Sequence, residues 1–489
     1  MAFSERNIVV IGAGIGGLTA AAMLAAEGAP VTVLETGSIP GGCAATFQRN
    51  GCRFDAGATV GCGFHPGGPM HRLGRELGIR WPVEREHIAW QYRQGVLLLD
   101  LSSTRKEILG HFPRSASFWQ EQGALSRLLW HLSAGGLAWP PKTARDLALL
   151  LQKGISGLSG TARLLPFVSR NAYEWLASHG LHADPLFMRF IDAQLMISAQ
   201  TTARHAHALN AAIALDLPVS GAWRVRGGIG SVAALLARSI EERGGAVLFG
   251  KRVVRIDAMR CQVLGLETAD GSAIAADLVI ANLTPDSLAR LLGDDAFPVL
   301  GPKGPSPEWS AFMLYLAVDS GVFPDAFPRH LQLVAPDGEL GEGNSIFMSV
   351  SPPGEQERAP RGLAAVTIST HTRPDQWFRA RSESRERYQA LKASYTERVL
   401  DLLESQLPGV RQSIRFMEAG TPFTWERYTG RYRGFVGSYP QTGLFDVRGP
   451  ETGFDNLFLV GDSIFPGQSL PGVVTGARRV VELVRRQEA

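Results

Sequence analysis

The first fifty residues carry the pattern that most constrains the fold of this chain. Residues 8–11 form a short apolar run, as in buried parallel strands. A glycine-rich turn follows, and the alanine-rich stretch 18–26 predicts a helix that Gly28 ends. Residues 31–34 predict a second strand, and Glu35 comes directly after it. This order is that of a Rossmann-type unit, in which a dinucleotide lies at the start of the helix.

The turn and the acid have separate tasks in such a unit. Glycine lets the backbone turn tightly and approach a pyrophosphate, while the helix start offers free N–H groups and a partial positive charge. A carboxylate 18 residues after Gly17 can accept both ribose hydroxyls, and it disfavours the 2′-phosphate of NADP. The alternative is a turn that serves helix packing only. The residues expected to contact the dinucleotide are Gly12, Ala13, Gly14, Gly16, Gly17 and Glu35.

A second glycine pair, Gly41 and Gly42, lies just beyond the acid. The basic fingerprint does not need this pair, which resembles the extended motif of two-dinucleotide-domain flavoproteins, where the chain runs back past the pyrophosphate. Many such proteins have arginine or serine next. Here the next residue is Cys43, so we expect it to contribute no cation. The pair favours FAD over NAD.

The C-terminal region strengthens the prediction of a flavin. Residues 456–460 predict a strand that ends at Gly461 and Asp462, and the carboxylate of Asp462 could accept a hydrogen bond from the ribityl chain. Pro471 suits the first position of the last helix. The N–H groups of Gly472 and Val473 would then point out of the helix start and stabilise negative charge at the N1/O2 edge of a reduced flavin. Taken alone, the Gly-Asp pair is more typical of a turn at the end of a strand, and the N-terminal motif is what favours the flavin.

These motifs resemble those of the superfamily of phytoene desaturases, carotenoid cis–trans isomerases and retinol saturases, which are FAD-dependent oxidoreductases. The resemblance rests on residues 12–42, 54–59, 223–230, 420–428 and 461–472. The stretch 465–468 is closest to the isomerases, whereas 470–473 is closer to bacterial desaturases. The resemblance implies an amine-oxidase-like fold, a hydrophobic polyene substrate, and a backbone contact between Val254 and the adenine.

The fold class expected is therefore α/β, with a discontinuous Rossmann-type FAD-binding domain over 1–75, 223–299 and 416–489. Residues 76–222 and 300–415 would form an inserted mixed α/β substrate domain with a helical lobe. The chain shows no second dinucleotide fingerprint. We therefore expect an external electron acceptor, either a quinone or oxygen.

Charge and cysteine content exclude several other classes. The net charge is +3, from 49 basic and 46 acidic residues, too balanced to predict a nucleic-acid partner. The four cysteines show neither a disulfide framework nor a zinc signature, so we expect no metal site. No secretory signal and no run of about 18 apolar residues is visible, which favours a cytoplasmic protein.

Residues 122–173 form a basic, apolar segment that is typical of membrane-surface helices. The alternative is a helical cap that packs on its own core, and the resemblance favours peripheral membrane association because carotenoids reside in bilayers. The basic residues are Arg127, Lys142, Arg145, Lys153, Arg163 and Arg170, opposed only by Asp146.

No side chain stands out as an obligatory acid or base. Desaturation and cis–trans isomerisation of a polyene both depend mainly on the cofactor, so neither reaction requires one. Asp192 and Gln194 are catalytic candidates because they are polar residues on a helix expected to be buried. The alternative is that they make helix-to-loop hydrogen bonds. Arg427 is a third candidate, lining the flavin face. The expected activity is desaturation by hydride transfer to flavin N5. Alternatives are redox-neutral cis–trans isomerisation with reduced FAD, polyene saturation, amine oxidation, flavin-dependent hydroxylation, or flavin and carotenoid binding without turnover.

Overall fold

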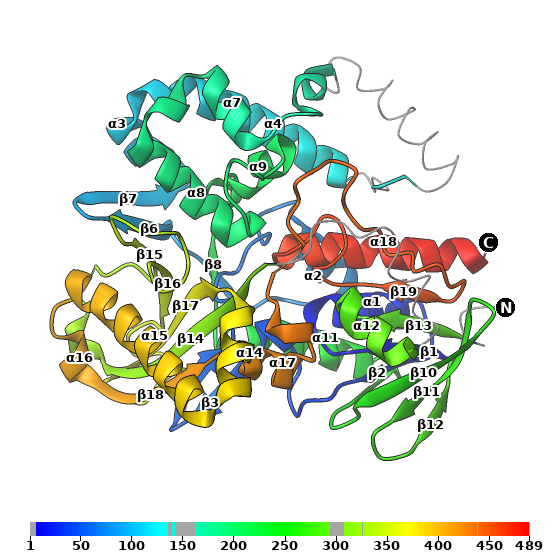
Figure 1. The fold of residues 1–489 in the computed structure, drawn as a ribbon. Helices are drawn as coiled ribbons and strands as arrows, with labels where there is room; N and C mark the ends of the chain where they lie inside the picture. The colour runs from blue at the N-terminus through cyan, green and yellow to red at the C-terminus, as the bar shows by residue number, and fades with distance from the viewer. Residues whose placement is uncertain are drawn as a thin grey trace.

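The first sheet of the molecule is parallel and has five strands in the order β19-β13-β1-β2-β9 (Figure 1). The structure is a computed structural model that describes residues 6–134, 139–141, 162–293, 308–324, 326–437 and 439–488. The strand order, with β1 between β13 and β2, is that of a Rossmann-type sheet and confirms the predicted fold class. The strands are β1 (Ile8–Ile11), β2 (Val31–Leu34), β9 (Ala246–Leu248), β13 (Leu278–Ala281) and β19 (Leu457–Leu459).

Helix α1 (Ile15–Ala26) is buried along nearly its whole length, from Ile15 to Ala25. It packs against α11 (Gly230–Glu241) and α18 (Leu470–Glu488), and Figure 1 shows it lying close to α18. Alanine and glycine dominate α1, and their small side chains allow both neighbours to approach closely. The helix that starts at the glycine turn is therefore fixed by segments from the middle and the end of the chain.

A three-stranded antiparallel sheet lies beside this body, in the order β10-β11-β12. Its strands are β10 (Val253–Met259), β11 (Gln262–Thr268) and β12 (Ala273–Ala275). A hairpin turn at Asp270-Gly271 joins β11 to β12, and Gly271 has a φ of +81°. A left-handed conformation of this kind favours glycine.

The second body is built on a mixed seven-stranded sheet in the order β18-β14-β17-β16-β15-β6-β7, where only the β15–β6 pairing is parallel. Helices α14 (Pro374–Glu383) and α15 (Arg385–Gln406) lie along it (Figure 1). The expected domain boundary at residue 416 falls inside β18, which pairs with β14 and so belongs to this sheet. The strands are β6 (Ile88–Gln94), β7 (Leu97–Ser102), β14 (Ser310–Asp319), β15 (His330–Val334), β16 (Ser345–Val350), β17 (Leu363–Thr372) and β18 (Ile414–Gly420).

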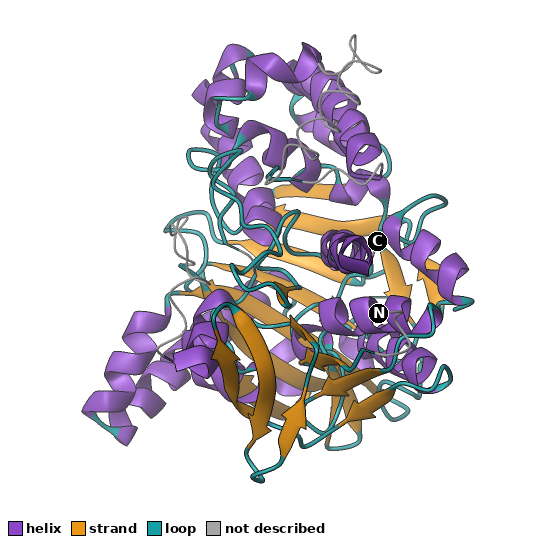
Figure 2. Ribbon diagram, turned by 90° about the vertical axis from the view of Figure 1, so that its right-hand side faces the viewer, coloured by secondary structure: helices purple, strands orange, loops and turns teal. Residues whose placement is uncertain are grey.

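A helical lobe stands over the β6–β7 edge of this sheet, at one end of the molecule in Figures 1 and 2. Its aromatic core includes Phe118, Trp175, Phe187 and Phe190, all buried. The lobe confirms the expected inserted helical region. Its described helices are α3 (Lys106–His111), α4 (Ala116–Ala134), α7 (Ala172–Ser178), α8 (Pro185–Ala199), α9 (Ala208–Ala214) and α10 (Leu217–Ser220).

The basic segment is described only in part. Arg127, Arg163 and Arg170 are exposed, and Leu165 next to Arg163 is 71% exposed. Among the described residues, no helix combines the length and apolar character needed to cross a bilayer. Lys142, Arg145, Asp146 and Lys153 lie outside the described residues.

Candidate active site

The turn between β1 and α1 is packed too tightly for any side chain at its glycines. Gly12 has a φ of +94°, in the region that L residues rarely adopt. A Cβ added at Gly14 would lie 2.3 Å from Asn282 Nδ2, and one at Gly16 would lie 2.8 Å from Gly461 Cα. The close approach of the protein's own segments thus requires these glycines, and it joins the N-terminal glycine turn to the C-terminal one.

Asn282 is a site residue that the sequence analysis did not single out. It directly follows β13, and its backbone N–H donates to the Ile11 carbonyl at 2.9 Å. Its side-chain amide lies between the two glycine turns, close to Gly14, Gly16 and Gly461, and makes no hydrogen bond within the described chain. The signal that could have found it is its place at the carboxyl end of a strand next to β1, where α/β proteins bind ligands.

Glu35 faces the glycine turn, as a ribose-binding carboxylate should. Its Oε2 accepts a hydrogen bond from the Ala13 N–H and its Oε1 one from the Gly37 N–H, both at 2.7 Å. A carboxylate has about four acceptor positions, so capacity remains for two ribose hydroxyls. The contact to Ala13 also ties the acid to the turn that would hold the pyrophosphate.

The second glycine pair runs beside the first turn. Gly41 has a φ of +122°, its N–H donates to the Ala13 carbonyl at 2.8 Å, and it pairs with Gly14 as a β-bridge. Gly42 then begins the short 3₁₀ helix Gly42–Ala44. This is the backbone path that the extended flavoprotein motif predicts.

A cationic side chain lies next to Cys43, but it belongs to Arg431, which is distant in the chain. The guanidinium of Arg431 forms an ion pair with Asp462 at 3.0 Å, and a second hydrogen bond joins the two side chains at 3.1 Å. Burial raises the pKa of the Cys43 thiol, and the nearby Arg431 opposes that shift. Burial would lower the pKa of Arg431, but the Asp462 charge prevails and raises it, so the arginine stays protonated.

The structure therefore brings Arg431 to the site rather than Arg427. Arg427 is exposed on α17 (Pro422–Thr429), with its guanidinium 5.5 Å from the centre of the Tyr428 ring, which is itself 61% exposed. In addition to Asp462, Arg431 donates to the carbonyls of Phe435 at 2.5 Å and Gly437 at 2.8 Å. Asp462, expected to bind the ribityl chain, is thus held in place by an arginine.

The start of the last helix differs from the expectation. Helix α18 begins at Leu470, one residue before Pro471. The N–H of Val473 donates to the Ser469 carbonyl at 2.9 Å, and that of Gly472 lies 3.3 Å from the Ser469 Oγ. The Val473 N–H is consequently used within the helix, because the earlier start makes Ser469 its partner four residues back. The Gly472 N–H donates to a side chain rather than to a carbonyl of the helix, and its contact with a flavin stays a prediction.

Val254 lies on β10, at an irregularity in its pairing with β11 between Val253 and Arg255. The loop before β10 contacts Glu35, since the Lys251 N–H donates to the Glu35 carbonyl at 2.8 Å. This places Val254 on the strand that leaves the Glu35 region. Its contact with an adenine stays a prediction.

Asp192 and Gln194 have structural partners on α8. The Asp192 carboxylate accepts the Ala203 N–H at 2.7 Å, and burial raises its pKa. Gln194 accepts a hydrogen bond from the Trp90 Nε1 at 3.0 Å and donates one to Gln332 at 2.7 Å. These are the helix-to-loop and helix-to-sheet contacts of the alternative interpretation, and neither residue contacts the glycine turns.

Taken together, a parallel Rossmann-type sheet, two glycine turns in contact and an acid at the end of β2 that faces the first turn are the features of a dinucleotide-binding flavoprotein. The chain belongs to the family of flavin containing amine oxidoreductases, whose family model matches residues 15–485. The cofactor is FAD, and the cradle formed by Gly12, Gly14, Glu35, Gly41 and Asp462 fits it.

Individual relatives support this assignment over nearly the whole chain. The chain is 29% identical to the chloroplastic prolycopene isomerase of Daucus carota, over 96% of this chain and 78% of that protein. It is 24% identical to a neurosporene-forming phytoene desaturase of Cereibacter sphaeroides, over 97% and 94% of the two chains. An oxidoreductase from Methanosarcina mazei has a similar fold, with a TM-score of 0.66 at 20% identity, over 97% of this chain and all of that one. The chain is an FAD-dependent oxidoreductase or isomerase.

Replacing Glu35 with alanine is expected to weaken FAD binding about ten- to hundredfold, because hydrogen bonds to a charged group contribute about 1.5–3 kcal/mol. Flavin fluorescence during titration of the apoprotein measures the dissociation constant. Glu27→Ala is the matched control, since Glu27 follows the far end of α1 and forms an ion pair with Arg485. Equal affinity in the Glu35 variant and the wild type would contradict the ribose assignment.

Proposed function

We propose that this chain is an FAD-dependent enzyme acting on the double bonds of a carotenoid-like polyene. Cis–trans isomerisation is the leading reaction and desaturation the second. This reverses the order expected from the sequence, because the similarity to prolycopene isomerases exceeds that to the phytoene desaturases. The observation that carries the proposal is the composition of a cavity at the start of α18.

This cavity lies between the flavin body and the helical lobe. One wall comes from α18 and the loop before it, the other from α4, α8, α9 and α10. No described residue that lines it carries a charge. The lining consists of Trp130, Ser133, Ser198, Ala199, Asn210, Ile213, Ala214, Leu217, Gln441, Phe465, Pro466, Gln468, Ser469 and Gly472.

An uncharged cavity beside the helix start suits an apolar substrate whose reaction is carried by the cofactor. Bound FAD supplies either acceptance of a hydride at N5 or, when reduced, stabilisation of transient charge while a double bond rotates. The chain's own residues bind and orient: Trp130, Ile213 and Leu217 offer apolar contact and exclude water. The positive end of α18 at Gly472 stabilises negative charge in the same cavity.

Two hydrogen bonds hold the loop that forms the cofactor-side wall. Gln468 donates to the Ile197 carbonyl at 3.0 Å, and Gln441 donates to the Pro466 carbonyl at 2.6 Å. Both bonds connect the stretch 465–468 to other segments, and this is the stretch that most resembles the isomerases. Its position against the cavity is consistent with a role in orienting the polyene.

The cavity disfavours an amine oxidase activity. A protonated amine is a cation, and burying it without a carboxylate partner is costly. The described lining offers no carboxylate. A polyene saturase would use the same apolar cavity, and it differs from a desaturase in the direction of electron flow, because electrons pass from reduced flavin to the polyene.

An anaerobic assay with liposomes distinguishes these activities. Oxidised and chemically reduced holoenzyme are mixed separately with cis-configured and with saturated carotenoid precursors, and flavin absorbance and product geometry are followed together. Conversion of cis to trans bonds by the reduced enzyme alone, without net flavin oxidation, supports isomerisation. Flavin bleaching matched by new double bonds supports desaturation, and bleached flavin that reoxidises as double bonds disappear supports saturation. Absence of all three reactions overturns the proposal.

The partners and location proposed from the sequence are consistent with this function. A polyene dissolved in a bilayer has to enter from its surface, and Leu165, Val168 and Leu186 are exposed on the helical lobe, with Arg163 and Arg170 nearby in the chain. Desaturation would also need an external acceptor, a quinone or oxygen. We propose a cytoplasmic protein that contacts the membrane surface through this lobe.

A further inference from the structure

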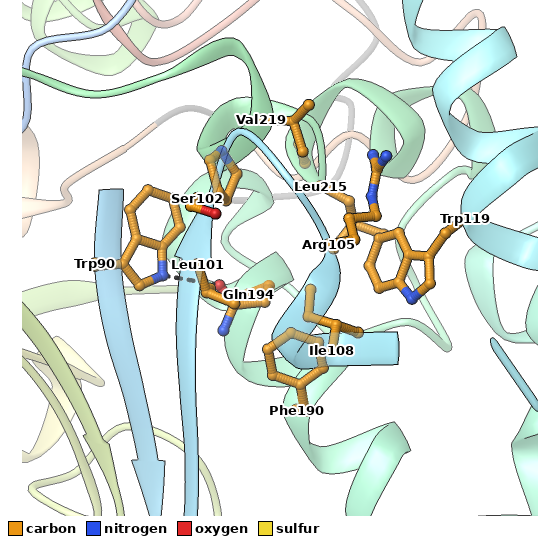
Figure 3. Close-up of a pocket in the computed structure, with 12 residues that line it drawn as sticks. Trp90, Leu101, Ser102, Arg105, Ile108, Trp119, Phe190, Gln194, Leu215 and Val219 are labelled. Atoms are coloured by element: carbon orange, nitrogen blue, oxygen red, sulfur yellow. Dashed lines mark hydrogen bonds between the residues drawn. The ribbon is translucent and has the colours of Figure 1, made fainter. Parts of the chain in front are cut away.

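A second pocket lies beyond the cavity at α18, between strands β6 and β7 and the helical lobe (Figure 3). Ala214 lines both, so the pocket continues the cavity away from the flavin body. Its walls are mostly apolar. Leu101, Ile108, Phe190 and Leu215 form much of that wall.

Some of the hydrogen-bonding groups that line this pocket have protein partners, and others have none. Figure 3 shows Trp90 hydrogen-bonded to Gln194, whereas Arg105 and Trp119 lie together in another part of the pocket. Trp119 is 4% exposed, and its Nε1–H is buried without a hydrogen-bond partner. The Nε–H of Arg105 is also buried and unpartnered.

The neighbours of Arg105 do not use its full donor capacity. A guanidinium has five N–H donors, and Arg105 donates to Gln122 and lies 4.0 Å from the Asp216 carboxylate. Asp216 is itself occupied, because it accepts hydrogen bonds from Ser126, Trp130 and Ser220. The Arg105 guanidinium carbon lies 5.1 Å from the centre of the Trp119 ring, so the two side chains that carry the unpartnered donors are neighbours.

Buried donors without acceptors are costly, and each such group calls for an explanation. Both orphan groups are donors, so the missing partner is an acceptor. We propose that this pocket binds a carbonyl-type oxygen, of an aldehyde or a carboxylate, at the end of the polyene substrate. This inference rests on the proposed function and narrows it, because it makes the substrate an oxygenated polyene rather than a pure hydrocarbon.

Three polyenes of the same chain test this inference on the holoenzyme: β-apo-8′-carotenoic acid, β-apo-8′-carotenal, and the hydrocarbon that ends in a methyl group instead. Titration of the polyene absorption spectrum gives the three affinities. The wild type should bind the acid or the aldehyde about tenfold more tightly than the hydrocarbon. Whichever of the two binds more tightly shows whether the pocket prefers a carboxylate or an aldehyde oxygen. Equal affinity for all three overturns the inference but leaves the proposed function standing.

Trp119→Phe removes one orphan donor and keeps the aromatic ring. It should lower the preference for the oxygenated polyene about two- to tenfold, the range expected for a lost hydrogen bond. Trp90→Phe is the matched control, because its indole lines the same pocket but already has a protein partner, and it should leave the preference unchanged. Equal effects of the two substitutions overturn the inference. Failure of all three polyenes to bind a protein that retains FAD overturns the proposed function as well.

Discussion

Arg431→Met is expected to yield a protein that retains little FAD and unfolds well below the wild-type temperature. The guanidinium forms an ion pair with Asp462 and hydrogen bonds to two backbone carbonyls, and the Arg431 side chain is only 13% exposed. Methionine would leave the Asp462 carboxylate without a cation, and breaking a buried pair on one side typically costs about 3–5 kcal/mol. The carbonyls of Phe435 and Gly437 would lose their donor too.

We expect FAD to be lost because the Arg431–Asp462 ion pair lies beside the two glycine turns. Asp462 directly follows Gly461, whose backbone meets the N-terminal glycine turn, so a displaced Asp462 disturbs both turns. Flavin content after gel filtration and thermal unfolding with and without added FAD measure the two effects.

Arg427→Met is the matched control for this prediction. Arg427 lies four residues earlier, on the exposed side of α17, and its guanidinium contacts only the exposed Tyr428 ring among the described contacts. Its replacement should change the free energy of unfolding by no more than about 0.5 kcal/mol, as for most surface positions. An Arg431 variant that keeps its FAD and melts like the Arg427 variant would show that Asp462 needs no cation.

The contrast between Arg427 and Arg431 shows where sequence reasoning reaches its limit. The glycine turns, Glu35 and the strands around them could be predicted because each depends on a local pattern: an apolar run, a turn, an acid at a fixed spacing. The contact of Arg431 with Cys43 and Asp462 joins three segments that lie far apart in the chain. No local pattern distinguishes Arg431 from its neighbour Arg427.

Polar residues of the helical lobe illustrate the same limit. Gln194 and Asp192 could be recognised as unusual in an apolar helix, but their partners, Trp90, Gln332 and Ala203, are set by tertiary packing. The sequence gives no sign that the Arg105 Nε–H and the Trp119 Nε1–H lack hydrogen-bond partners. Whether a donor has a partner depends on which groups the tertiary structure places beside it. The pairing of β18 with β14 has no local signal for a related reason, because it joins strands about a hundred residues apart in the chain.

Asp55→Asn is expected to destabilise the protein by about 3–5 kcal/mol, through the loss of one partner of a buried ion pair. Asp55 lies at the end of β4 (Cys52–Asp55) and pairs with Arg358 at 2.9 Å, with side chains 6% and 9% exposed. Its carboxylate also accepts hydrogen bonds from Thr46 Oγ1 at 2.6 Å and from the Ile229 N–H at 3.0 Å. An asparagine would keep the shape but leave the Arg358 charge uncompensated.

The Asp55 carboxylate also explains why the stretch 223–230 contains glycine at position 228. A Cβ at Gly228 would lie 2.6 Å from both Asp55 Oδ1 and Thr46 Oγ1, so the motif is glycine because the acid and hydroxyl approach the start of α11. Urea unfolding of apo and FAD-bound protein would measure the loss. Asp319→Asn is the control: its pair with Arg415 is exposed and should contribute no more than about 1 kcal/mol. If the two substitutions cost the same, the Asp55 cluster does not anchor α11. If only Asp55→Asn is costly, the Asp55 carboxylate links β4 to the start of α11.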